Sequence, residues 1–138
     1  MSIVVDAGPL IAVLNADDND HDSCLSLLNS VSGPLLVPAP VIVEVAWMTE
    51  KFRGSEAEAA FLRSLNSGEV EMVALNSEDI ERMAELVTIY ADLPLGSVDA
   101  SVIAVAERLG VRQVATLDRR HFTVVRPRHV EAFTLLPQ

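Results

Sequence analysis

Four carboxylic acids stand at positions in the sequence that suggest shared chemistry. Asp6 follows the β-forming run at residues 3–5, and Asp118 follows a second such run; Glu44 lies inside an apolar run, and Asp99 lies in the first turn of an expected helix. Four carboxylates brought together would repel one another and raise each other's pKa values unless a cation joined them. Clustered oxygen ligands suit Mg²⁺ or Mn²⁺. The sequence therefore predicts a divalent-metal site, provided that the fold gathers these acids.

The elements that carry these acids alternate between strands and helices. β-forming runs predict strands at residues 3–5, 35–37, 70–75, 113–117 and, at an edge, 133–136. Helices are expected between them, at residues 9–15, in a segment ending near 30, and at 40–52, 55–67, 77–90 and 97–109. This alternation predicts an α/β fold with a central, mainly parallel sheet of four to five strands flanked by helices. Ligands of such sheets bind beyond the carboxyl ends of the strands, where Asp6 and Asp118 are expected.

Local signals also predict where several elements begin. Ser55 followed by Glu58 predicts a capping box at the start of one helix. Ser77 is expected to cap the helix that follows the third strand. Residues 119–122 are expected to form a turn after the fourth strand.

Each acid also has a structural interpretation. Asp is a good helix N-cap, so Asp6 is able to cap the helix that follows it. Asp99 stands where the helix dipole favours a carboxylate. Glu44 fits this interpretation less well, because the apolar neighbours Val41 and Trp47 on its helix face suggest partial burial. A lone buried carboxylate costs on the order of several kcal/mol unless a cation, a partner or a proton relieves it.

Length and composition favour a single globular domain and argue against a membrane protein. With 138 residues and 50% hydrophobic content, the chain is expected to form a single domain over residues 1–138. No apolar run is long enough for a membrane helix, and the single Cys24 fits a reducing compartment, so we expect a cytoplasmic protein without membrane contact. A net charge of −10 argues against ordinary electrostatic binding to nucleic acid, although six of the ten basic residues lie from Arg108 onward.

Several other metal and phosphate sites are excluded. The acidic stretch at residues 17–22 lacks the glycine and the final acid of a calcium loop. His21 and Cys24 have a plausible zinc spacing, but no further Cys or His is grouped with them. A phosphatase with an aspartyl nucleophile would need an acid at Gly8, and there is no P-loop or G-x-G-x-x-G segment.

A resemblance covers essentially the whole chain. It is carried by four segments in order, Val4-Val5-Asp6, Val43-Glu44-Val45, Gly96-Ser97-Val98-Asp99-Ala100 and Thr116-Leu117-Asp118-Arg119-Arg120-His121-Phe122. Together they resemble the PIN-domain ribonucleases, in particular the VapC-type toxins of bacterial toxin–antitoxin pairs. The resemblance implies a PIN-like three-layer sandwich and a divalent-metal-dependent endoribonuclease that hydrolyses RNA phosphodiester bonds. It implies one or two Mg²⁺ or Mn²⁺ ions, held by Asp6, Asp99 and Asp118, with Glu44 holding or orienting a water.

The same resemblance extends to residues near the acids. Thr116 matches a hydroxyl position that often lines the site, and Asp92 lies near the site in such sequences. Arg119 or Arg120 is a candidate for contact with RNA phosphate, with solvated surface charge as the equal alternative. No histidine base is required, so His121 is expected to have no essential part.

Partners are implied in the same way. A VapB-type antitoxin should cover the apolar faces around Val45, Trp47, Met48, Phe61 and Leu62 and send a basic side chain toward the acids. For these apolar residues the alternative is an ordinary place in the core. A homodimer is also expected. The alternative is a non-catalytic PIN-like module that binds RNA or a protein partner without cutting, and the intact set of four acids argues against it.

Overall fold

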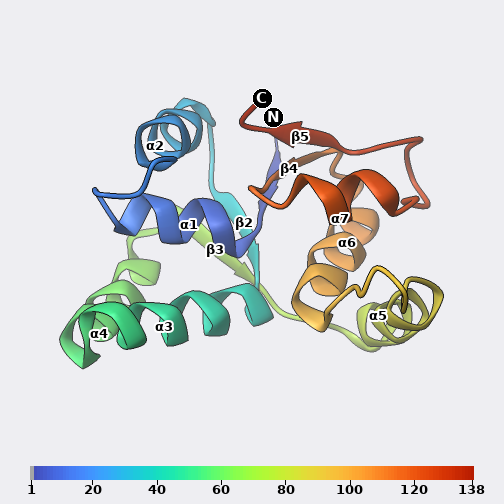
Figure 1. Cartoon of the computed structure of the whole chain (residues 1–138), viewed down its shortest axis with the longest axis horizontal. Coiled ribbons are helices and arrows are strands. Elements are labelled where there is room, and N and C mark those ends of the chain that lie inside the picture. Colours follow the sequence, from blue (N-terminus) through green and yellow to red (C-terminus); the bar gives the residue numbers. More distant parts are fainter. Residues whose placement is uncertain (1) are drawn as a thin grey trace.

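A five-stranded parallel sheet forms the centre of the protein in a computed structural model that describes residues 2–138 (Figure 1). Its strands are β1 (Ile3–Val5), β2 (Leu35–Pro38), β3 (Val70–Val73), β4 (Gln113–Ala115) and β5 (Thr134–Leu136). They lie in the order β3-β2-β1-β4-β5, and every neighbouring pair is parallel. The predicted α/β fold is confirmed, with five strands and an entirely parallel sheet.

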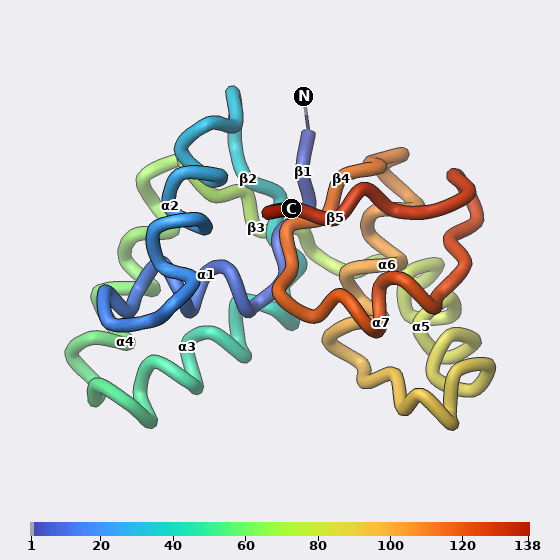
Figure 2. The backbone as a smooth tube through the Cα atoms, turned by 45° about the horizontal axis from the view of Figure 1, so that its top comes forward, coloured from blue at the N-terminus to red at the C-terminus, as the bar shows by residue number. Residues whose placement is uncertain are grey.

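Seven α-helices in residues 2–138 connect the strands. They are α1 (Ala7–Leu14), α2 (His21–Ser30), α3 (Ala39–Arg53), α4 (Ser55–Ser64), α5 (Ser77–Ile89), α6 (Ser97–Leu109) and α7 (Arg119–Val124), and the 3₁₀ turn η1 (Leu65–Ser67) follows α4. Both ribbon views place α1–α4 beside the β2–β3 half of the sheet and α5–α7 beside the β4–β5 half (Figures 1 and 2). None of these helices has the length and apolar content needed to cross a membrane.

The chain builds the sheet outward in two opposite directions from the pair β1 and β4, although all strands are parallel. The chain passes from β1 to β2 on one side, whereas β4 leads to β5 on the other side. A crevice forms beyond the carboxyl ends of two strands at such a switch point, and ligands of parallel sheets bind there. β1 and β4 pair in register from Ile3 with Gln113 to Val5 with Ala115, so the segments that follow both strands begin at the same edge.

The core holds this edge in place. All three residues of β1 are fully buried, as expected for a central parallel strand that is covered on both faces. Helix α6 contributes the buried residues Val102, Ile103, Val105 and Ala106, and it packs against α5, α3, β1 and β2. Because most of α6 is fixed in the core, its first turn has a defined position near the end of β1.

Two predicted helix caps are wrong by one residue. Gly54, at φ +87°, is the N-cap of α4, and no side chain makes a capping hydrogen bond there, so Ser55 is the first helical residue and forms no capping box. Helix α5 is capped by Asn76 instead of Ser77. Asn76 Oδ1 accepts the Asp79 N–H at 2.8 Å and Asp79 Oδ2 accepts the Asn76 N–H at 3.0 Å. In both places the residue before the expected cap already has the non-helical backbone that an N-cap requires.

The expected turn at residues 119–122 is also wrong, because these residues begin helix α7. Asp118 caps this helix by accepting the His121 N–H at 3.2 Å. Phe122 is buried in its middle and packs edge-on against Phe133, with 6.3 Å between the ring centroids. The cap and the buried ring together stabilise a helix of only six residues.

Candidate functional site

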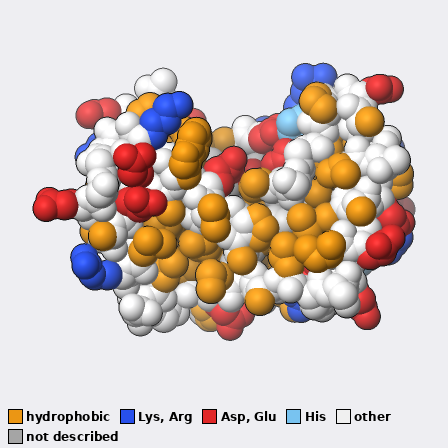
Figure 3. All heavy atoms as spheres, turned by 90° about the horizontal axis from the view of Figure 1, so that it is seen from below, with side chains coloured by type: hydrophobic (Ala, Val, Ile, Leu, Met, Phe, Trp, Pro, Cys, Tyr) orange, Lys and Arg blue, Asp and Glu red, His pale blue; other side chains and the backbone are white. Residues whose placement is uncertain are grey.

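The four acids selected from the sequence line one cleft at the carboxyl edge of the sheet. This cleft has a volume of about 670 Å³ and is lined by Asp6, Ala7, Gly8, Ile11, Glu44, Met48, Asp99, Leu117 and Asp118. Figure 3 shows acidic side chains gathered in a hollow of this face, with hydrophobic side chains around it. The acids come from four parts of the chain that are brought together only by the fold.

Gly8 allows the two walls of the cleft to approach. A Cβ atom added at Gly8 would lie 3.3 Å from the Cβ of Leu117, closer than most such contacts. The first turn of α1 therefore packs directly on the segment that follows β4, and this packing keeps Asp6 near Asp118.

Asp6 is the deepest of the four acids, with 6% of its surface exposed. Its Oδ2 accepts a hydrogen bond from Thr116 Oγ1 at 2.9 Å, and Thr116 Oγ1 in turn accepts the Asp118 N–H at 3.0 Å. Burial raises the pKa of Asp6, hydrogen bonds from the Ala7 backbone N–H and the Thr116 hydroxyl oppose this rise, and the charge of Asp118 adds to it. The Asp6 side chain makes no capping hydrogen bond to α1, and it lines the cleft beside the other acids.

Glu44 and Asp99 complete the cleft from two helices. Glu44 is half-buried in α3, and burial together with the charge of Asp6 raises its pKa. Asp99 is the third residue of α6, and burial followed by the charges of Asp6 and Asp118 raises its pKa to about 6. The cleft concentrates negative charge in a poorly solvated space, and this is the cause of the raised pKa values.

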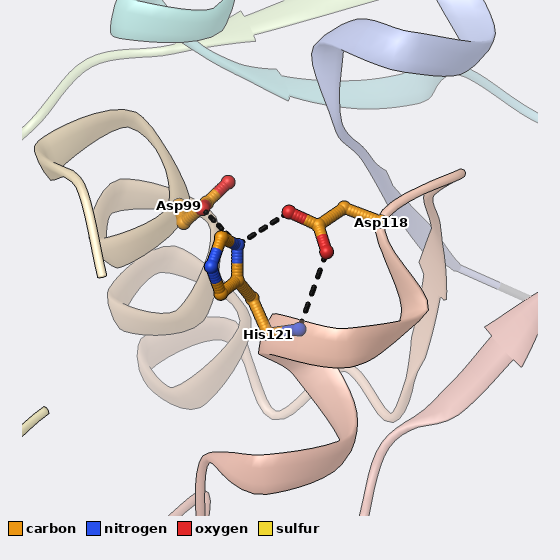
Figure 4. A group of neighbouring side chains, drawn as sticks. All are labelled: Asp99, Asp118 and His121. Carbon is orange, nitrogen blue, oxygen red and sulfur yellow. Dashed lines mark hydrogen bonds and ion pairs between the residues drawn. The ribbon is translucent and has the colours of Figure 1, made fainter. Parts of the chain in front are cut away.

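His121 belongs to this site, although the sequence prediction gave it no essential part. Its Nδ1 lies 3.0 Å from Asp99 Oδ2 and also contacts Asp118 Oδ2 (Figure 4). Figure 4 shows the imidazole ring between the two carboxylates, one on α6 and the other at the start of α7. The signal in the sequence is the i, i+3 spacing of Asp118 and His121, which places both side chains together only if residues 119–124 are helical.

The remaining candidate residues lie at different distances from the four acids. Thr116 is buried beside Asp6, as described above. Asp92 is exposed in the turn between α5 and α6 and is not among the residues that line the cleft. Arg119 donates from Nη1 to the Pro137 carbonyl at 3.2 Å, and Arg120 is exposed on the first turn of α7.

Two arginines of the basic C-terminal part are paired with acids far from the cleft. Arg108 Nε lies 3.0 Å from Asp79 Oδ1, and Arg128 Nη2 lies 2.9 Å from Glu85 Oε2. These pairs attach α6 and the segment after α7 to α5. Their positive charge is therefore partly balanced within the protein.

The apolar residues predicted to bind a protein partner divide into two groups. Val45 is fully buried and Phe61 is 7% exposed, so both belong to the core and their assignment to a docking surface is wrong. Trp47 and Leu62 are 57% and 44% exposed, and Met48 is half-buried in the lining of the acidic cleft. The periodicity of α3 identified an apolar helix, but α3 packs against α4, α1 and α6, and these contacts decide which apolar side chains turn inward.

The raised pKa of Asp99 predicts how pH changes the stability of the metal-free protein. Between the ordinary pKa of 3.8 and about 6, the folded state binds more protons at this site than the unfolded state. The free energy of unfolding should therefore fall as pH rises through this window and stay lower above it. The contribution of Asp99 is at most about 3 kcal/mol, because each pKa unit corresponds to about 1.4 kcal/mol. In EDTA, the thermal midpoint of Asp99→Asn minus that of the unmodified protein should increase from pH 4 to pH 7; a difference independent of pH would contradict this.

The PIN domain family model matches residues 3–126. The sequence is 33% identical over 135 residues to Ribonuclease VapC26 of Mycobacterium tuberculosis, and the alignment covers 98% of this chain and all of the relative.

Solved structures show the same fold. VapC20 of M. tuberculosis, described as a sarcin-ricin loop cleaving toxin, has a TM-score of 0.81 at 21% identity, with 94% of this chain and 99% of that chain covered. VapBC2 from Rickettsia felis, solved bound to a DNA fragment from its promoter, has a TM-score of 0.71 at 15% identity, with 98% of this chain and 97% of that chain covered.

Proposed function

The chain belongs to the PIN-domain family, in its VapC branch, and from this premise we propose that it is a toxin endoribonuclease that hydrolyses RNA phosphodiester bonds with Mg²⁺ or Mn²⁺. One observation carries the proposal: Asp6, Glu44, Asp99 and Asp118 line a single cleft at the switch point of the sheet. The relative that shares 33% of the sequence is named a ribonuclease, which supports RNA as the substrate.

The residues of the cleft fit a divalent cation. Three of the acids, Asp6, Glu44 and Asp99, have pKa values raised first by burial and then by the charge of a neighbouring acid. A dication would offset this repulsion, and carboxylate oxygens are the ligands that Mg²⁺ and Mn²⁺ prefer. We assign Asp6, Asp99 and Asp118 as ligands of one or two ions. A bound ion would stabilise negative charge on the scissile phosphate and make a water more acidic.

The other residues of the site orient these groups. Thr116 holds the Asp6 carboxylate through its hydroxyl and receives the Asp118 N–H, so one side chain sets the positions of two acids. Glu44 lines the same cleft from α3, and its raised pKa suits it to accept a hydrogen bond from the attacking water. Arg120 is our candidate for RNA phosphate, because Arg119 already bonds to the Pro137 carbonyl.

The partners follow from the same family membership. We propose that a VapB-type antitoxin covers the exposed side chains of Val43, Trp47, Phe52 and Leu62 on α3 and α4, because exposed apolar patches of this kind mark protein interfaces. The Rickettsia felis relative is itself a VapBC complex by its description. We further propose that residues 1–138 form a single PIN domain, that the protein forms a homodimer, and that it acts in the cytoplasm, where its RNA substrate is found.

A thermal unfolding experiment separates this enzyme from the non-catalytic module considered above. A ligand that binds only the folded state, at 100 times its Kd, stabilises a protein by about 2.7 kcal/mol. For a domain of this size that corresponds to roughly 5–10 °C in thermal midpoint. Millimolar Mn²⁺ should therefore raise the midpoint of the unmodified protein by this amount and that of Asp99→Asn by much less. No shift in the unmodified protein would favour the module that binds without cutting.

A further inference from the structure

His121 is the histidine whose ring contacts the acids of the cleft. Its Nδ1 is 3.0 Å from Asp99 Oδ2 and contacts Asp118 Oδ2. One ligand atom from each of these three residues lies within 4.8 Å of the other two. Neighbouring ligand atoms of an octahedral ion with bonds of about 2.1 Å are separated by about 3.0 Å. The Nδ1–Asp99 Oδ2 distance already equals this spacing, whereas the closer contact between Nδ1 and Asp118 Oδ2 would have to widen for one ion to bind both atoms.

The position of the ring is set by the chain around it. His121 is in the first turn of α7, and its backbone N–H is bound by Asp118 Oδ1 at 3.2 Å. The next residue, Phe122, is buried against Phe133 and fixes the rotation of α7 about its axis. The imidazole is partly shielded, with 21% of the side chain exposed. Its direction toward the acids therefore follows from the cap and the core as well as from the attraction between the side chains.

We propose that His121 is a metal ligand through Nδ1, beside Asp99 and Asp118, and that it makes the site select Mn²⁺ over Mg²⁺. This inference rests on the proposed metal-dependent function. Mg²⁺ takes oxygen ligands almost exclusively, whereas first-row transition ions accept imidazole nitrogen as well. Ligation requires a free lone pair on Nδ1, so the ring proton of the loaded protein resides on Nε2.

The contacts of the three histidines single out His121 as the nitrogen ligand. Of the other two histidines, His21 bonds through Nδ1 to the Ala12 carbonyl at 2.8 Å, and His129 bonds through Nε2 to the Val111 carbonyl at 2.7 Å. The rings of His21 and His129 contact these backbone carbonyls, whereas His121 contacts Asp99 and Asp118 of the cleft. A nitrogen signal from a metal ion in the cleft would therefore come from His121.

Mn²⁺ itself is a direct probe of this ligand. Electron paramagnetic resonance of free Mn²⁺ measures the affinity, and pulsed measurements on the bound ion detect a directly coordinated nitrogen. The unmodified protein should show a ¹⁴N coupling that is replaced by a ¹⁵N coupling when its histidines are labelled with ¹⁵N. His121→Gln should lose the coupling and bind Mn²⁺ about tenfold or more weakly. Its affinity for Mg²⁺ should change about threefold or less. His21→Gln is the matched control and should leave both affinities and the coupling unchanged.

The possible outcomes separate the role of His121 from the presence of the metal site and from its selectivity. Tight binding of Mn²⁺ by the unmodified protein without a nitrogen coupling would overturn the role of His121 while leaving the acidic metal site intact. No binding of Mn²⁺ at all would overturn both this inference and the metal dependence of the proposed function. Equal losses of Mn²⁺ and Mg²⁺ affinity in His121→Gln would overturn the selectivity. If that variant fails to fold, the labelled spectrum of the unmodified protein still tests the ligand.

Discussion

Asp99→Asn is expected to reduce RNA cleavage about 10³-fold or more, equivalent to roughly 4 kcal/mol of transition-state stabilisation, while the protein remains folded. Asn has nearly the same shape as Asp but lacks the charge that a dication requires. Asp99 lines the cleft and lies 3.0 Å from His121, so the substitution removes a negative ligand without opening a cavity. Initial rates of RNA cleavage with Mn²⁺ measure this effect.

The stability of the same variant separates a functional acid from a structural one. Burial and the charges of Asp6 and Asp118 raise the pKa of Asp99 to about 6, so its ionised form destabilises the metal-free fold at neutral pH. The variant should therefore be at least as stable as the unmodified protein in EDTA. Asp22→Asn, at an exposed acid in the first turn of α2, is the matched control and should cleave normally. An unfolded Asp99→Asn protein would show that Asp99 is a structural residue of α6, and undiminished cleavage would remove it from the active site.

Asp118 is expected to show two separable roles. Its carboxylate lines the cleft, and the same side chain caps α7 by accepting the His121 N–H. Asp118→Asn retains a good capping side chain but loses the charge, so cleavage should fall about 10²-fold or more with little change in thermal midpoint. Asp118→Ala loses both functions and should in addition lower the free energy of unfolding by about 1 kcal/mol.

A control for the cap is available on another helix. Asn76 caps α5 through the Asp79 N–H, and it does not line the cleft. Asn76→Ala should cost a similar stability, about 1 kcal/mol, while cleavage by the folded protein is unchanged. Equal cleavage by Asp118→Asn and the unmodified protein would show that Asp118 is only a helix cap.

The sheet and the placement of the acids could be predicted from the sequence because they follow from short-range patterns. Residues 3–5 are three β-formers followed by Asp6, and a parallel strand that is buried on both faces has this composition. Glu44 was identified as an anomaly among apolar neighbours, and α3 does turn it toward the cleft. The alternation of strands and helices then implied that these segments reach one edge of the sheet.

The details that were missed depend on contacts between distant segments. Helix α7 is stabilised by the packing of Phe122 on Phe133 and by the Asp118 cap. The helical backbone in turn directs His121 toward Asp99. Val45 and Trp47 are both apolar residues of α3, but packing against α4, α1 and α6 buries the first and leaves the second exposed. Periodicity identifies an apolar helix, whereas its neighbours decide which side is covered.

The most direct measurement is the cleavage of total cellular RNA by purified protein with Mn²⁺ or Mg²⁺, with the new 5′ ends mapped. Parallel reactions contain EDTA or the Asp99→Asn variant. The proposed function predicts discrete cuts that disappear in both controls, and the mapped ends would identify the RNA target. Intact RNA after incubation with folded, antitoxin-free protein that has bound Mn²⁺, or cuts that persist in EDTA, would contradict a metal-dependent endoribonuclease.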